Sequence, residues 1–201
     1  FVANYPGATI ATMGKALKQL GFTAAEDILA GDRGLLGAMT PDNHPEALTR
    51  ALSWENCALL TNSLKPYACC RHTHAADYCA QLLRGEHRLG HITRIVDHTY
   101  QVAVNTVDNP EPSTPYGYKF SGQYCTAAML VYGHLGESAF TPEATSDPRV
   151  RRLMDKITLV CDPELEASYQ ADRNRWAHRL EVTLEDGREL TRQVEYPYGD
   201  F

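Results

Sequence analysis

The clearest structural signal in this sequence is a β-hairpin near its C-terminal end. Apolar and polar residues alternate over 180–184, as expected for a strand that buries one face. Asp186-Gly187 follows, a dipeptide that strongly favours a tight turn between antiparallel strands. Residues 190–194 then continue as the returning strand. The fold must therefore contain a sheet with antiparallel pairing.

The first third of the chain predicts helices. Residues 10–20 carry apolar side chains at helical spacing, and Gly21 stands where a left-handed residue ends a helix. Shorter helices are predicted over residues 24–29 and 44–52, where capping residues precede the apolar positions.

From Ser63 onward, predicted strands alternate with predicted helices. A helix begins near His74, and the β-branched stretch from Ile92 to Val104 predicts a strand. Three prolines make residues 109–115 a loop. Further helices are predicted from Ser121 and over residues 147–157.

These patterns predict an α+β fold in two parts. Residues 1–62 form a helical segment, which we expect to be the C-terminal end of a helical domain. Residues 63–201 form an α+β domain with a mostly antiparallel sheet. The sequence begins with Phe rather than Met, so we expect a piece of a longer protein.

The charge balance and the cysteines limit the functions to consider. The formal net charge of -6 argues against nucleic-acid binding, which needs a broad basic surface. No apolar run is long enough to cross a membrane, and no secretion signal is visible. The six cysteines lack the regular spacing of a disulfide framework, which indicates a reducing compartment. We therefore expect a soluble, cytoplasmic protein.

The densest group of reactive side chains is the segment 65–74, Lys-Pro-Tyr-Ala-Cys-Cys-Arg-His-Thr-His, which ends where a helix begins. Arg71, His72 and the first turn of that helix could hold a carboxylate by charge-assisted hydrogen bonds. In a structural alternative, Arg71 pairs with a nearby acid and the cysteines fill the core. Zinc binding by residues 69, 70, 72 and 74 is a weaker alternative, because the spacing is unusual and Arg71 would repel the ion.

A second candidate is Gln123-Tyr124 in the first turn of the helix that begins near Ser121. Tyr124 could donate or accept a proton, and Gln123 could hydrogen-bond a carboxylate. The structural alternative is that Tyr124 packs as a half-buried aromatic side chain.

The segment Leu64–His74 resembles the MmgE/PrpD family, which includes 2-methylcitrate dehydratase, cis-aconitate decarboxylase and iminodisuccinate epimerase. Further segments resemble the family in the same order along nearly the whole chain. They are Gly21-Phe22-Thr23, the run from Ile28 to Gly34, Phe120 to Tyr124, Phe140-Thr-Pro-Glu and Asp147-Pro-Arg-Val.

The resemblance implies that residues 63–201 are a lid and that the active site lies between this lid and a helical domain built largely from other residues. Lys65 and His74 match the family's Lys-x-Tyr motif and its terminal His, and Gln123-Tyr124 matches its Gln-Tyr pair. Some decarboxylases carry a histidine where this chain has Cys70, so His72 is an alternative proton carrier. The family's N-terminal Asp, His and Lys have no match here, so we expect the isolated piece to be inactive.

The resemblance further implies a cofactor-independent lyase without a metal, which acts on a small di- or tricarboxylate such as 2-methylcitrate or cis-aconitate, and a homodimer. The expected roles are substrate binding by Lys65, Arg71 and Gln123 and proton transfer by His72 or His74 with Tyr124. The alternatives are an epimerase of the same family and a non-catalytic binding or dimerisation module.

Overall fold

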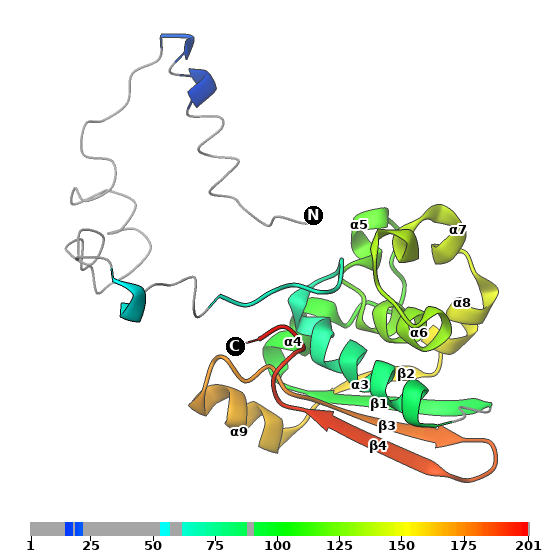
Figure 1. Ribbon diagram of the computed structural model, residues 1–201. Coiled ribbons are helices and arrows are strands. Elements are labelled where there is room, and N and C mark those ends of the chain that lie inside the picture. Colours follow the sequence, from blue (N-terminus) through cyan, green and yellow to red (C-terminus); the bar gives the residue numbers. More distant parts are fainter. Residues whose placement is uncertain (1–14, 18, 22–52, 57–61, 88–90, 201) are drawn as a thin grey trace. The chain divides into compact units, whose positions relative to one another are not determined.

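The computed structural model describes residues 15–17, 19–21, 53–56, 62–87 and 91–200 (Figure 1). The chain separates into two compact units, residues 1–61 and 62–201. In the first unit, residues 15–17 are helical, and Gly21 has a φ of +83°, the left-handed conformation predicted for it. The helices predicted over 24–29 and 44–52 lie outside the described residues.

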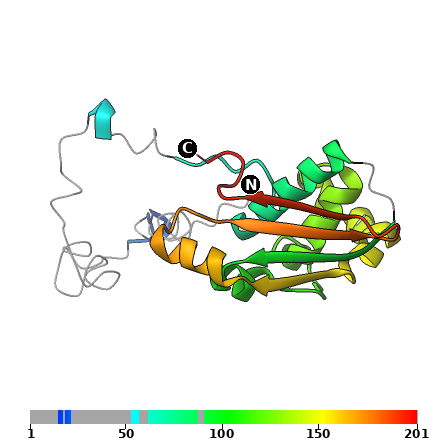
Figure 2. The same ribbon diagram turned by 90° about the horizontal axis from the view of Figure 1, so that it is seen from below.

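A mixed sheet of four strands forms the base of the second unit, in the order β2-β1-β3-β4 (Figures 1 and 2). The strands are β1 (Ile92–Thr99), β2 (Ile157–Cys161), β3 (His178–Leu184) and β4 (Glu189–Val194). β1 pairs with β2 in parallel, whereas β1–β3 and β3–β4 are antiparallel. The predicted α+β class and mostly antiparallel sheet are therefore confirmed, and the predicted hairpin is β3–β4.

Two helices, α3 (His74–Glu86) and α6 (Gly122–Tyr132), cover one face of the sheet (Figures 1 and 2). The strand alternation directs Leu180 and Val182 into the core. Every residue from Gly122 to Leu130 is buried, as expected for a helix that is apolar on all sides. Both helices begin where the sequence predicts, and the Ser121 hydroxyl caps α6 by accepting a hydrogen bond from the backbone N–H of Tyr124 at 3.0 Å.

The remaining helices surround this core. They are α4 (Gln101–Val107), α5 (Pro115–Tyr118), α7 (Pro142–Thr145), α8 (Pro148–Met154) and α9 (Pro163–Ala171), with short 3-10 turns at Trp54–Asn56, Arg71–Thr73 and Glu137–Phe140. Within the described residues, no helix has the length and apolar character needed to cross a membrane.

Two predicted elements end earlier than expected. The strand predicted over 92–104 stops at Thr99, and the chain continues as α4, whose buried residues Ala103 and Val107 lie one helical turn apart. The helix predicted over 147–157 stops at Met154, and Ile157 begins β2, where it pairs with Ile95 of β1. The helix α9 was not predicted.

Candidate functional site

The predicted carboxylate-binding corner lies at the 3-10 turn Arg71–Thr73, directly before α3. Arg71 donates a hydrogen bond from Nη1 to the carbonyl oxygen of Leu64 at 3.2 Å and forms an ion pair with Asp200. Its guanidinium carbon lies 5.6 Å from the centre of the Trp176 ring. Arg71 thus pairs with an acid of its own chain, as the structural alternative predicted, and it does so at the edge of a pocket.

This pocket has a volume of about 250 Å³. Its lining consists of Ser63, Arg71, Asp172, Asn174, Trp176, Tyr196 and Asp200. Among the lining residues that the structure describes, Arg71 is the only basic side chain, and one of the two acids is its ion-pair partner. The pocket therefore presents a single guanidinium, which already binds a carboxylate, beside an aromatic wall. A guanidinium favours carboxylates because its planar donors match their two oxygens.

His72 lies next to Arg71 and is held by two aromatic residues. Its Nδ1 lies 2.6 Å from the Tyr100 hydroxyl, and its ring stacks on Trp176 with a centroid distance of 4.6 Å and an interplanar angle of 6°. Burial, with a smaller contribution from His178, lowers the pKa of His72 from 6.5 to about 4. This imidazole is therefore uncharged at neutral pH.

A buried polar cluster lies beneath the corner. The Thr73 hydroxyl hydrogen-bonds Oδ2 of Asp77 at 2.8 Å, and the Cys69 thiol lies 3.5 Å from the same oxygen. Burial, followed by the proximity of Cys69, raises the pKa of Asp77 well above its ordinary value. The cluster thus links the turn before α3 to the first turn of the helix through hydrogen bonds.

The zinc alternative gains no support from this cluster. In the described part of the chain, the one group of three potential ligands close enough to share a metal ion is Cys69, Asp77 and Cys125, whose ligand atoms lie within 4.8 Å of one another. The zinc alternative named residues 69, 70, 72 and 74, and this group contains only the first of them. A structural zinc site needs four ligands, and Asp77 already accepts hydrogen bonds.

The other predicted site residues are not gathered around the pocket. Lys65 is exposed, whereas His74 and Tyr124 are fully buried. The Tyr124 hydroxyl donates a hydrogen bond to the carbonyl oxygen of Ala139. Burial raises the pKa of Tyr124 further above its ordinary value, so the phenol stays protonated. Within the second unit the Tyr124 side chain therefore supports the fold.

Gln123 is also buried and uses both ends of its amide. Nε2 donates to Oδ1 of Asp108 at 2.6 Å, and Oε1 accepts from the backbone N–H of Asn109 at 3.2 Å. The amide thus fastens the start of α6 to the Pro-rich loop. Of the predicted site residues, Arg71 lines the pocket, and His72 stacks on Trp176, another lining residue.

A buried hydrogen-bonded chain between β1 and β3 was missed in the sequence. His178 Nδ1 lies 2.7 Å from Oδ1 of Asp97, and Nε2 lies 3.0 Å from the Thr99 hydroxyl, which donates to the carbonyl oxygen of Ala177 at 3.1 Å. All three side chains are at most 1% exposed. A charged residue at an inward position of each strand was the available signal, but strand register was needed to pair them.

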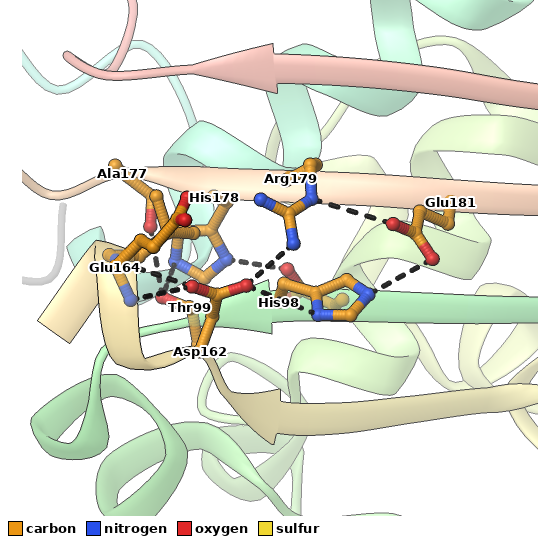
Figure 3. A network of polar contacts seen from close by, with 10 residues as sticks. His98, Thr99, Asp162, Glu164, Ala177, His178, Arg179 and Glu181 are labelled. Carbon is orange, nitrogen blue, oxygen red and sulfur yellow. Dashed lines mark hydrogen bonds and ion pairs between the residues drawn. The ribbon is translucent and has the colours of Figure 1, made fainter.

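The opposite face of the sheet carries a second polar network (Figure 3). Arg179 donates to Oδ2 of Asp162 at 2.5 Å, and His98 lies between Asp162 and Glu181, with Nε2 3.1 Å from the Glu181 carboxylate. Asp162 also caps α9 by accepting from the backbone N–H of Glu164 at 2.9 Å. The network fastens α9 to the sheet and matches positive with negative charges.

Comparison with known proteins identifies the family. The family model described as "MmgE/PrpD C-terminal domain" matches residues 67–201, which are more than half of the chain. The mitochondrial 2-methylcitrate dehydratase of Yarrowia lipolytica is 32% identical over 136 residues, which are 64% of this chain and 26% of that protein. The 2-methylcitrate dehydratase of Cupriavidus necator is 34% identical over 111 residues, 54% of this chain and 23% of that protein. The chain thus matches about a quarter of the length of these relatives, and it belongs to the MmgE/PrpD family.

Proposed function

We propose that the complete protein is a lyase that removes water from a small tricarboxylate, with 2-methylcitrate as the first substrate to test. The family match and the two relatives named 2-methylcitrate dehydratase support this proposal. The observation that carries it to particular residues is the pocket at the start of α3, where the Arg71 guanidinium pairs with the Asp200 carboxylate beside Trp176, and His72 stacks on the same Trp176 ring.

The proposed reaction requires a binding site for the substrate carboxylates. A base removes a proton from the carbon next to a carboxylate, negative charge grows on that carboxylate, and the hydroxyl group leaves from the neighbouring carbon as water after it gains a proton. A cation at the carboxylate stabilises this charge in the transition state. Arg71 fills this role in our proposal, and the exposed Lys65 is a second candidate because it precedes the same corner.

The substrate is tested with the full-length enzyme. It is incubated separately with 2-methylcitrate, citrate, cis-aconitate and iminodisuccinate, and the products are identified by NMR. We expect loss of water from 2-methylcitrate. Decarboxylation of cis-aconitate or epimerisation of iminodisuccinate as the preferred reaction would refute the dehydratase assignment.

The carboxylate clamp is tested by Arg71→Ala in the same enzyme. Loss of charge-assisted hydrogen bonds should raise KM by about 10- to 100-fold. Arg151→Ala is the matched control, because Arg151 also stands over an aromatic ring, Tyr118, but lines a different pocket. If R71A and R151A have the same KM as the wild-type enzyme, Arg71 does not bind substrate.

The homodimer implied by the family resemblance stays a prediction. Light scattering of the full-length protein tests it directly, and a mass of one chain would refute it.

A further inference from the structure

The hydrogen bond between His72 and Tyr100 determines which nitrogen of His72 carries a proton. Tyr100 is completely buried, and its hydroxyl lies 2.6 Å from His72 Nδ1. Burial raises the pKa of Tyr100 above its ordinary value, so the phenol keeps its proton. Within the described residues, Nδ1 is the one hydrogen-bond acceptor near this hydroxyl, and a buried hydroxyl that donated to nothing would cost free energy. Tyr100 therefore donates to Nδ1, and the proton of the neutral imidazole is on Nε2.

The ring of His72 is also fixed in orientation. One side stacks on the indole of Trp176, and the indole N–H donates to the carbonyl oxygen of Arg173 at 2.7 Å. Tyr100 is held in turn by stacking on Tyr169 of α9, with a centroid distance of 4.2 Å and an interplanar angle of 18°. The aromatic contacts leave His72 little freedom to rotate, so the direction of its Nε2–H is set before a ligand arrives.

The charged groups around His72 favour the neutral form. Arg71 precedes it in the chain, and His178 of β3 lowers its pKa further beyond the effect of burial. Tyr100 and Trp176, the groups in direct contact, carry no charge. His72 Nε2 has no hydrogen-bond partner among the described residues, and the side chain is only partly buried. The free N–H can therefore reach a ligand.

Arg71 and His72 both lie against the Trp176 ring, which lines the pocket. We propose that His72 is a fixed, uncharged hydrogen-bond donor that offers its Nε2–H to an oxygen of an anionic ligand bound at Arg71, with Tyr100 and Trp176 as its positioning residues. This inference deepens the proposed function and rests on it for the identity of the ligand. It differs from the proton-transfer role expected from the sequence, because a neutral imidazole with this hydrogen bond polarises an oxygen without exchanging its proton. An uncharged donor also keeps its strength over the whole neutral pH range.

The protonation state is tested by neutron diffraction from crystals of the full-length protein at pH 7. A deuteron on Nε2 and none on Nδ1 is expected. A deuteron on Nδ1, or on both nitrogens, overturns the inference whatever the enzyme's activity.

The ligand contact is tested by calorimetric titration of the full-length protein with citrate. His72→Ala should weaken binding by about 10- to 100-fold, the loss expected for a hydrogen bond to a charged acceptor. His72→Gln should recover part of it, because its amide N–H can lie near the former Nε2. His134→Gln, at an exposed histidine, is the matched control. Citrate affinity in H72A equal to that of the wild type overturns the inference.

The positioning role is tested by Tyr100→Phe, which removes the donor to Nδ1 and leaves the ring stacking. Citrate binding should weaken in Y100F but change little further in the double variant Y100F/H72A. Fully additive losses would show that Tyr100 acts independently of His72 and would overturn its assignment. If citrate binding depends on His72 and Tyr100 as expected, but the wild-type protein dehydrates none of the tested acids, the proposed function is refuted and the inference stands.

Discussion

The buried pair of Asp97 and His178 should be the most sensitive polar contact in the second unit. Both side chains are 1% exposed and 2.7 Å apart. Asp97→Ala leaves His178 Nδ1 buried without a partner. Removal of one member of a buried, hydrogen-bonded pair typically costs about 3–5 kcal/mol. Folded domains have only about 5–15 kcal/mol of stability in total, so this change should be severe.

Urea unfolding at pH 7, followed by circular dichroism, measures the effect. With a slope of about 2 kcal/mol per molar urea, a loss of about 3–5 kcal/mol lowers the midpoint by about 1.5–2.5 M. Asp155→Ala, at an exposed acid after α8, is the control and should leave the midpoint unchanged.

A double-mutant cycle separates this pair from general damage to the core. In D97A/H178A neither partner is left alone, so the double variant should lose clearly less stability than the two single variants added together. A midpoint for D97A equal to that of D155A, or additive losses in the cycle, would refute the reasoning.

Three further predictions concern the corner and the helix behind it. Burial lowers the pKa of His72 from 6.5 in the unfolded chain to about 4 in the folded protein. As the pH falls from 6.5 towards 4, the His72 imidazole therefore gains a proton in the unfolded chain before it does so in the folded protein, and the folded state loses stability over this range. His72→Gln should remove up to about 3 kcal/mol of this pH dependence. If the urea midpoint falls by the same amount between pH 7 and pH 4.5 in the wild type and in H72Q, this prediction is contradicted. Asp200→Asn should strengthen citrate binding by about twofold to tenfold, since the carboxylate on Arg71 no longer competes; unchanged affinity in calorimetry would argue against a ligand site at Arg71. Gly133→Ala should destabilise the end of α6 by about 1–2 kcal/mol, because Gly133 has a φ of +79°, and an unchanged thermal midpoint would contradict this.

Local signals in the sequence were sufficient for several elements. Asp186-Gly187 specifies its turn because Gly187 adopts a φ of +84°, which few other residues tolerate. Ser121 specifies the start of α6 by a hydrogen bond within three residues. The family resemblance likewise needed only short motifs in order. In each case the information lies within a few neighbouring positions of the chain.

Contacts between distant segments decided the rest. β2 is a strand because Ile157 pairs with Ile95, and α4 is a helix whose buried residues Ala103 and Val107 lie one turn apart, despite the preference of valine for strands.

The candidate site follows the same rule. Nothing in the sequence places Trp176 against His72 or Asp200 on Arg71, since these pairs are more than a hundred residues apart. The sequence determined which reactive groups the corner contains. Only the tertiary structure decided which of them are buried and which are paired, because burial and hydrogen-bond partners come from residues far away in the chain.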